Sequence, residues 1–234
     1  MKFPQPLIPA KLRQRYQRFL ADVELADGTI TIAHCPNSGS MRSCNAPGSD
    51  IQLSYHPAPH RKYAYTWEMI RVNSIWVGIN TLIPNRLIPE SITSGKILEL
   101  QGYEKIQREP SVGPGTRLDL RLQQADASCY VEIKNVTLVE NEVALFPDAV
   151  TLRGQKHLLA LIDLHRQGHR SVVVFLIQRQ DAQLFAPADE IDPEYGRLLR
   201  LAADAGVEIL PYRAVVTPEE IYLDQRLPIG WHKF

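Results

Sequence analysis

The sequence predicts two domains, a small all-β barrel over residues 1–82 and an α/β sandwich over residues 83–234. Short runs that alternate apolar and polar residues fill the first third of the chain, whereas helical patterns appear between the strands that follow. The chain has 234 residues, 44% of them hydrophobic, which is enough to bury two small cores. Because no distinctive linker separates the two patterns, we expect the domains to pack closely.

Turn signals separate the strands of the first domain. Asp27-Gly28 stands between two apolar runs and is typical of a β-hairpin. Residues 36–39 and 46–49 are rich in Pro, Gly, Asn and Ser and indicate loops. Several short strands with little helix are typical of an oligonucleotide-binding (OB) barrel, which is the fold we predict. The predicted strands cover residues 15–25, 29–35, 51–56, 63–72 and 74–80.

The second domain combines helical and strand patterns in an order typical of an α/β sandwich. Pro89 interrupts the first helical pattern, so we expect it to start that helix or to break it. The predicted helices cover residues 84–98, 151–167 and 193–205. The predicted strands cover residues 104–110, 116–122, 129–139, 171–178 and a final strand 207–213, and residues 143–148 are expected to add a fourth strand beside the first three.

Several classes of protein are disfavoured by composition. The longest apolar run, residues 171–177, is too short to cross a bilayer, and the N-terminus lacks the pattern of a signal peptide. Three cysteines, Cys35, Cys44 and Cys129, do not indicate a disulfide framework. We therefore expect a cytoplasmic protein without a membrane partner, and the oligomeric state is left open.

Charge is distributed unevenly although the net charge is zero. Residues 1–82 hold nine Lys/Arg and five Asp/Glu, whereas the remainder holds 17 and 21. A basic first domain and an acidic second domain would suit phosphate binding and metal binding respectively. Ordinary fluctuation explains a difference of this size equally well.

Asp119, Glu132 and Lys134 are the predicted catalytic residues. Strand alternation turns Glu132 and Lys134 to one face, and the spacing from Asp119 suits two adjacent antiparallel strands. Two neighbouring carboxylates repel each other unless a cation compensates. Asp119 and Glu132 are therefore the predicted metal ligands, and Mg2+ or Mn2+ is the expected cofactor. Lys134 could stabilise charge that develops on a phosphate.

The alternative to a catalytic role is an exposed cross-strand ion pair, which a Glu-x-Lys sequence often forms. Asp119 on the preceding strand, the apolar flanks and the following helix favour the site instead. The pattern resembles the PD-(D/E)xK nuclease fold, with Leu118 in the position of the motif's proline.

Longer stretches resemble the bacterial sugar fermentation stimulation protein A (SfsA) family. The resemblance is strongest in YVEIKNVTLVENEVALFPDAVTLRGQKHLLAL, residues 130–161, and extends over essentially the whole chain. Residues 13–25, 34–41, 61–70 and 77–92 match it too. It implies an OB-like domain, a PD-(D/E)xK-like domain, DNA binding with little sequence preference, and a role in regulating sugar, notably maltose, metabolism. Nuclease activity is suggested by the fold and is not the family's accepted function.

Basic and amide side chains supply the predicted DNA contacts. Some lie near the first barrel strand or among aromatic residues, where phosphates meet charge and bases can stack. Others lie at a helix start, where backbone amides also favour phosphate. The competing interpretation places the aromatic Tyr65 and Trp67 in the barrel core and the charges in solvent. The predicted DNA-binding residues are Arg15, Arg18, Asn37, Arg61, Lys62, Arg153 and His157.

Two further carboxylates remain ambiguous. Asp148 could be a third metal ligand, although an N-terminal cap before Thr151 is the favoured interpretation. Glu99 could be a helix-borne carboxylate of the metal site.

Three functions are consistent with these patterns. The first is nonspecific DNA binding, the second is Mg2+-dependent hydrolysis of DNA, and the third is an interaction module in which the cluster is a relic. No recognition helix of the helix-turn-helix type is evident, so we do not expect the protein to read a specific promoter sequence.

Overall fold

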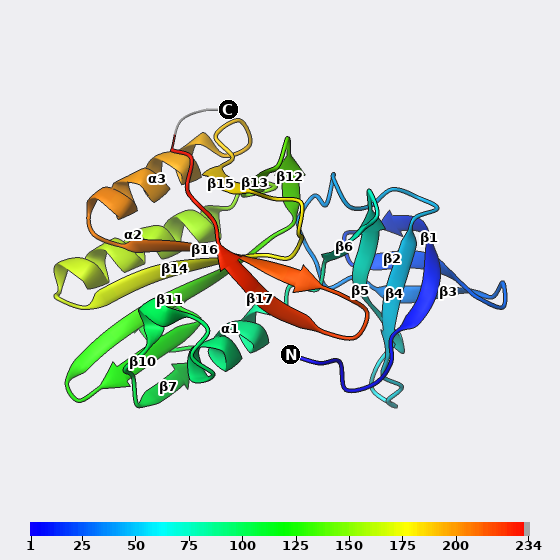
Figure 1. Ribbon diagram of the computed structural model, residues 1–234, viewed down its shortest axis with the longest axis horizontal. Helices are drawn as coiled ribbons and strands as arrows, with labels where there is room; N and C mark the ends of the chain where they lie inside the picture. The colour runs from blue at the N-terminus through cyan, green and yellow to red at the C-terminus, as the bar shows by residue number, and fades with distance from the viewer. Residues whose placement is uncertain (232–234) are drawn as a thin grey trace.

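A closed β-barrel forms the first domain of the computed structural model, which describes residues 1–231 (Figure 1). β1 pairs with both β2 and β4, and a parallel pairing of β3 with β5 closes a ring of five strands. β6 extends the sheet beyond β5. This arrangement confirms the predicted OB barrel. The strands are β1 (Ile8–Tyr16), β2 (Leu20–Leu25), β3 (Ile30–His34), β4 (Asp50–Tyr55), β5 (Tyr65–Val72) and β6 (Ile75–Gly78).

The prediction of one strand over residues 15–25 is wrong. A turn separates β1 from β2, and Gln17 and Arg18 occupy it with φ angles of 49° and 62°. Neither residue is a glycine, so the sequence carries no turn signal there. The hairpin at Asp27-Gly28 is confirmed, since Gly28 has a φ of 84° and the Leu25 amide donates to the Thr29 carbonyl over 2.9 Å.

Alternating side chains of the barrel strands fill its core. Leu12, Val23 and Leu53 are fully buried there. Trp67 is also fully buried, and its indole Nε1 donates to the Met69 carbonyl over 2.9 Å. Tyr65 is only half-buried and packs beside Tyr55, with ring centroids 5.0 Å apart. Trp67 is therefore a core residue and not an exposed platform for bases.

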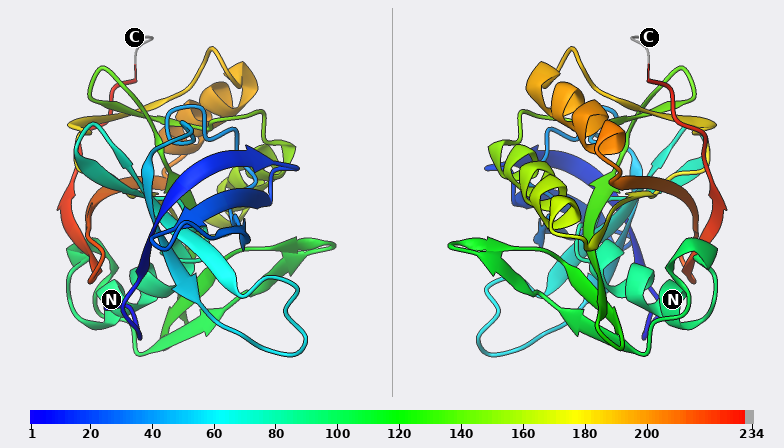
Figure 2. Two further views of the ribbon diagram at one scale, coloured as in Figure 1. Left: turned by 90° about the vertical axis from the view of Figure 1, so that its right-hand side faces the viewer. Right: turned by 90° about the vertical axis from the view of Figure 1, so that its left-hand side faces the viewer.

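A six-stranded mixed sheet is the centre of the second domain, in the order β17-β16-β14-β11-β10-β7. β11, β14 and β16 are parallel, and antiparallel strands flank them. α2 and α3 lie side by side on one face and α1 covers the other (Figure 2). The elements are α1 (Pro84–Thr93), η1 (Leu98–Leu100), β7 (Lys105–Arg108), β8 (Ser111–Gly113), β9 (Thr116–Arg117), β10 (Leu120–Gln124), β11 (Ala127–Val136), β12 (Leu138–Glu140), β13 (Val143–Phe146), α2 (Leu152–Arg166), β14 (Arg170–Ile177), β15 (Leu184–Pro187), α3 (Pro193–Asp204), β16 (Glu208–Val216) and β17 (Ile221–Arg226).

Several predicted strands of this domain differ from the structure. The strand predicted at residues 116–122 is broken between β9 and β10, and the strand predicted at residues 129–139 divides into β11 and β12, which belong to different sheets. The segment at residues 143–148 contains β13, but it pairs with β12 and β15 in a separate three-stranded sheet and does not extend the main one. The strand predicted as final is followed by β17, which pairs with it at the sheet edge. The second and third predicted helices and the buried strand β14 are confirmed.

Pro89 lies inside α1 and neither starts nor breaks it. Proline has no N–H to donate to the carbonyl four residues earlier, which is that of Asn85. Arg108 takes the place of this missing donor, since its Nη1 donates to the Asn85 carbonyl over 2.6 Å. The helix ends at Thr93, five residues before the predicted end at residue 98.

The two domains pack directly against each other, as predicted. The Gly78 amide donates to the Gln178 carbonyl over 2.9 Å, and the Met41 amide donates to Oδ2 of Asp148 over 3.1 Å. A Cβ at Gly39 would lie 2.4 Å from the same Asp148 oxygen, so only glycine permits this approach. Among the described residues, no helix is both long and apolar enough to span a membrane.

Candidate active site

β11 positions Glu132 and Lys134 on one face of the main sheet. Val131 and Ile133 point to the opposite face and pack in the core that α1 covers. Tyr130 and Val136 pack in the core beneath α2 and α3. The predicted alternation along this strand is therefore confirmed.

Asp119 lies in the break between β9 and β10, beside Glu132 of the neighbouring strand. Its Oδ2 accepts a hydrogen bond from the Ile133 amide over 2.7 Å, and its Oδ1 accepts one from Nδ2 of Asn85 over 3.2 Å. Burial and the negative charge of Glu132 raise the pKa of Asp119 to about 6. The charge of Glu132 therefore disfavours ionisation of Asp119, as expected for a carboxyl group beside a charged carboxylate.

Glu132 is almost fully buried and uses one carboxylate oxygen for two partners. Its Oε1 accepts from Nζ of Lys134 over 2.6 Å and contacts Nδ1 of His157 as well. The Lys134 Nζ and His157 Nδ1 atoms lie 3.5 Å apart. Burial opposes ionisation of Glu132, but the charge of Lys134 and the hydrogen bond from His157 hold its pKa below the usual value. Glu132 is consequently a buried carboxylate kept in its charged form.

The other oxygen of Glu132, Oε2, is buried and has no hydrogen-bond partner among residues 1–231. The hydroxyl of Tyr195 is likewise buried and unpaired, and burial together with the charge of Glu132 raises its pKa well above the ordinary value. An unsatisfied buried carboxylate oxygen beside a second carboxylate suits a divalent cation. Within residues 1–231, however, His, Cys, Asp and Glu do not form a group of three metal ligands, so Asp119 and Glu132 would need water or backbone oxygens to complete a site.

A cleft of about 540 Å³ lies between the domains and includes Lys134 in its wall. Arg18 and Asn37 of the barrel and Asn85, Thr151 and Arg153 of the second domain also line it. An adjoining cavity of about 580 Å³ shares Arg153 and is lined by three more basic or titratable side chains, Arg117, Lys156 and His157. The site thus opens toward basic residues of both domains.

The structure separates the predicted DNA-binding residues into two groups. Arg18, Asn37 and Arg153 line the interdomain cleft, and His157 is buried against Glu132. Arg61 lines a different cavity. Lys62 follows it on the β4–β5 loop, with its Nζ 5.4 Å from the ring centroid of Tyr63.

Arg15, which does not line the cleft, and Asn37, which does, both stabilise the loop that forms part of the cleft wall. The Arg15 guanidinium donates to the carbonyls of Asn37, Gly39, Ser40 and, through Nε, Arg18, at distances of 2.8 to 3.3 Å. Nδ2 of Asn37 donates to the Ile79 carbonyl over 3.1 Å, and its Oδ1 accepts from the Gly39 amide over 2.8 Å. Their polar groups are occupied by the loop at residues 37–40, which they shape.

The two ambiguous carboxylates lie elsewhere than expected. Asp148 does not cap α2, because Thr151 does so by accepting from the Gly154 amide over 3.1 Å. Asp148 instead binds the barrel loop through Met41. Glu99 accepts from the hydroxyl of Tyr212 over 2.5 Å and pairs with Arg226 over 2.9 Å, on β16 and β17 and away from Asp119.

Sequence reasoning missed Asn85 and Tyr195. Asn85 lies 34 positions before Asp119, at the start of a helix, and no local pattern links the two. Tyr195 lies on α3 and faces Glu132 only because α2 and α3 pack on the same face of the sheet. The predicted helix 193–205 placed Tyr195 near its start, but nothing in the sequence indicated the neighbouring charge.

The chain is a two-domain protein in which an OB barrel precedes a mixed α/β domain that holds a buried cluster of acidic and basic side chains. Family comparison agrees with this division. Residues 14–79 match the description "SfsA N-terminal OB domain", and residues 82–220 match "Sugar fermentation stimulation protein RE domain". The chain belongs to the sugar fermentation stimulation protein family.

Relatives and a solved structure match along nearly the full length. A sugar fermentation stimulation protein homolog of Geobacter metallireducens is 57% identical, covering 98% of this chain and 99% of that one. The homolog of Pelobacter propionicus is 56% identical, with coverage of 98% and 99%. The structure of SfsA from Pyrococcus furiosus, described as a complex with Ca2+, has a TM-score of 0.90 at 29% identity and covers 98% of both chains.

Proposed function

We propose that this protein binds DNA with little regard to sequence and that the interdomain cleft is its principal phosphate-binding surface. The observation that carries the proposal is that Arg18 of the barrel and Arg153 of the second domain line the same cleft as Lys134. Cations from two domains that converge on one cleft suit a polyanion that passes between them.

The start of α2 supports the same proposal. Arg153 lies in its first turn, which contains no acidic residue, and Thr151 at its N-cap lines the cleft. Asp192 and the Thr151 hydroxyl already accept from the Thr151 and Gly154 amides there, so the helix dipole and the Arg153 guanidinium are the features that favour phosphate. These contacts address the sugar-phosphate backbone and not base edges, so they would confer little sequence preference.

A regulatory role would follow from this binding. The relatives are named for sugar fermentation, and the family resemblance implies regulation of sugar, notably maltose, metabolism. In this proposal the protein acts on DNA in the cytoplasm, and regulation results from occupancy of DNA and not from recognition of one operator.

The experiment is a DNA titration at several salt concentrations with unrelated duplexes of equal length. We expect weak binding that falls steeply with salt, because each phosphate contact releases counterions, and similar affinities for all sequences. Equal affinity at low and high salt would contradict the proposal, and so would a strong preference for one duplex in competition.

A second candidate function is Mg2+-dependent hydrolysis of DNA, consistent with a PD-(D/E)xK-like domain. The unpaired Oε2 of Glu132 and the raised pKa of Asp119 support it, because one divalent cation would relieve both. Mg2+, or Mn2+, would supply Lewis acidity and a more acidic bound water. Asp119 and Glu132 would hold the ion.

The remaining residues have separate tasks in this second candidate. Lys134 would place its ammonium group beside the phosphate and stabilise charge that develops on it. His157 would act as a positioning residue, because its contact with Oε1 leaves Oε2 of Glu132 free for the metal. Arg153 would orient the phosphate from the cleft side.

The test is cleavage of DNA with Mg2+ or Mn2+ by the parent protein and by Glu132→Ala and Lys134→Ala. We expect Glu132→Ala to abolish cleavage and, without metal, to leave DNA affinity unchanged or modestly raised. Cleavage by Glu132→Ala at the parental rate would assign the activity to a contaminant or another site. If the parent does not cleave with either metal, the binding function alone stands.

A further inference from the structure

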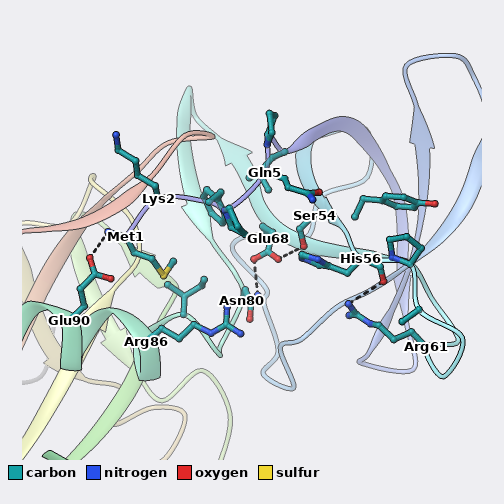
Figure 3. Close-up of a pocket in the computed structure, with 18 residues that line it drawn as sticks. Met1, Lys2, Gln5, Ser54, His56, Arg61, Glu68, Asn80, Arg86 and Glu90 are labelled. Carbon is teal, nitrogen blue, oxygen red and sulfur yellow. Dashed lines mark hydrogen bonds and ion pairs between the residues drawn. The ribbon is translucent and has the colours of Figure 1, made fainter.

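A separate cavity of about 1010 Å³ lies on the other side of the segment that joins the domains (Figure 3). The same short segment walls both spaces. Thr81, Pro84 and Asn85 line the interdomain cleft, whereas Asn80 and Arg86 line this cavity. The cavity is therefore adjacent to the candidate active site but distinct from it.

Residues 1–7 form a strap along this cavity. Lys2 pairs with Glu220 as a β-bridge, and the Phe3 amide donates to the Glu219 carbonyl over 3.2 Å. The strap then continues into β1, so it connects the β16–β17 turn of the second domain with the barrel (Figure 3). A cavity bounded by a strap, a barrel and α1 has the size of small-molecule sites, which are about 300–1,000 Å³.

Glu68 is the buried acceptor of this cavity, with 6% of its surface exposed. Its Oε1 accepts from Oγ of Ser54 over 2.6 Å, and its Oε2 accepts from Nδ2 of Asn80 over 2.7 Å. Both of these donors are uncharged. Each carboxylate oxygen has two lone pairs and can accept a further hydrogen bond. A buried carboxylate supported by neutral donors is therefore well placed to bind donor groups of a ligand, such as hydroxyls.

Two guanidinium groups flank the same cavity. Arg86 projects from α1 toward Asn80 (Figure 3), and within residues 1–231 its side chain makes no hydrogen bond or ion pair. Arg61 projects from the β4–β5 loop and is held by Oγ1 of Thr66 over 3.1 Å. Arg86 is therefore available for a bidentate contact with an anion such as phosphate, and Arg61 adds positive charge at the other end of the cavity.

We propose that this cavity binds a small organic phosphate that carries free hydroxyl groups, such as a sugar phosphate or a nucleotide. Arg86 binds its phosphate, the positive charge of Arg61 at the other end of the cavity attracts the anion, and Glu68 accepts hydrogen bonds from its hydroxyls. The ring of Tyr55, which also lines the cavity, adds an apolar surface for a sugar or a base. This site is independent of the DNA-binding cleft, since neither Glu68 nor Arg86 nor Arg61 lines that cleft.

The experiment is calorimetric titration of the full chain with ribose 5-phosphate and adenosine 5′-monophosphate, which represent the two sources. Inorganic phosphate and ribose serve as the separate halves. We expect one or both of the joined compounds to bind more tightly than either half. Glu68→Gln and Arg86→Gln should each weaken that binding about tenfold or more, because each loses a charged hydrogen-bond partner.

Arg71→Gln is the matched control. Arg71 is exposed on β5, lies against Trp76 at 5.9 Å from its ring centroid, and does not line the cavity. The Arg71→Gln substitution removes one positive charge, as Arg86→Gln does, and should leave ligand binding unchanged. Gln at position 68 can still accept from Asn80 and donate to Ser54, so the variant should fold, and a thermal melt checks this. If it does not fold, Arg86→Gln at the surface decides the test.

Three results would overturn the proposal. The first is absence of binding by both joined compounds. The second is inorganic phosphate binding as tightly as they do, which would remove the role of Glu68. The third is an equal loss of affinity in Arg86→Gln and Arg71→Gln, which would indicate general electrostatic attraction and not a site.

Discussion

Glu68 in the barrel and Glu132 in the second domain are buried to nearly the same degree, 6% and 3% exposed, yet their surroundings differ. Both oxygens of Glu68 accept from neutral donors, Ser54 and Asn80. Glu132 has one oxygen shared by Lys134 and His157 and one oxygen that no other described residue contacts through a hydrogen bond.

These surroundings determine what each carboxylate can bind. Lys134, His157 and a second carboxylate surround Glu132, and its unsatisfied oxygen suits a metal ion. Glu68 has satisfied oxygens, no neighbouring acid in its hydrogen-bond network, and arginines across a cavity, which suits a neutral donor group of a ligand. In the two proposals, the same residue type therefore binds a metal ion in one domain and a hydroxyl of a ligand in the other.

Removing a hydrogen-bond partner of either buried carboxylate should change the free energy of unfolding more than any other substitution considered for these two residues. Lys134→Met should lower the free energy of unfolding by about 3–5 kcal/mol, because it leaves Glu132 with a buried charge and one fewer cation. Ser54→Ala removes only a neutral donor from Glu68 and should cost about 1.5–3 kcal/mol. Chemical denaturation of both variants measures the difference. Equal costs would mean that the two carboxylates are not held in different ways.

A divalent metal ion should stabilise the protein through Glu132 and not through Glu68. Mg2+ or Mn2+ at about one hundred times its dissociation constant should stabilise the parent by about 2.7 kcal/mol, because only the folded state brings Asp119 and Glu132 together. Asp119→Asn and Glu132→Gln should lose this stabilisation, whereas Glu68→Gln should keep it. Thermal melts with and without metal provide the measurement. Loss of the effect in Glu68→Gln would place the metal in the barrel instead.

The pH dependence of stability should report on Asp119. Protonating this carboxyl group should stabilise the metal-free fold, whereas removing the partner of a buried carboxylate destabilises it. Its folded pKa of about 6 lies above the ordinary value of 3.8, so the folded state binds a proton more tightly than the unfolded state. Without metal, stability should therefore increase as pH falls from about 6 toward 3.8, and this contribution is absent above the folded pKa.

Asp119→Asn makes the site neutral and keeps an acceptor for the Ile133 amide. Above the folded pKa it should stabilise the metal-free protein by about 1–3 kcal/mol, and the advantage should shrink as the pH is lowered. Melts at roughly pH 8 and pH 5 compare the two regimes. A destabilised variant at the higher pH would show that Asp119 is not strained by the charge of Glu132.

Local patterns were sufficient for the parts of the fold that depend on neighbouring residues. Alternation along β11 placed Glu132 and Lys134 on one face, and Asp27-Gly28 marked a hairpin. The turn at Gln17 and Arg18 could not be predicted, because two residues that are not glycine adopt left-handed conformations there. β13 does not belong to the main sheet because it pairs with β15, which lies about 40 residues later in the chain. No local pattern reveals that pairing.

The candidate site shows the same division. Asp119, Glu132 and Lys134 were predictable because each lies on a strand or at its end and the strands are adjacent. Arg15 was predicted to contact DNA from its charge, but its guanidinium is occupied by loop carbonyls, a role that only tertiary structure discloses. The Glu68 cavity depends on a strap, a barrel and a helix that meet only in the folded chain.

Single substitutions of basic residues near the two carboxylates should change DNA affinity and its salt dependence by only a small amount. Arg18→Gln and Arg153→Gln should each weaken DNA binding equally for all sequences and reduce the slope of log affinity against log salt by about 0.9, the value for one phosphate contact. Arg86→Gln, which removes a charge from the Glu68 cavity, should leave the slope unchanged because Arg86 does not line the interdomain cleft. Fluorescence anisotropy with one labelled duplex, measured over a series of salt concentrations, resolves such differences. If Arg86→Gln flattens the slope as much as Arg153→Gln does, DNA lies across both sides of the joining segment. The cavity beside Glu68 would then be part of the DNA surface and not a separate ligand site.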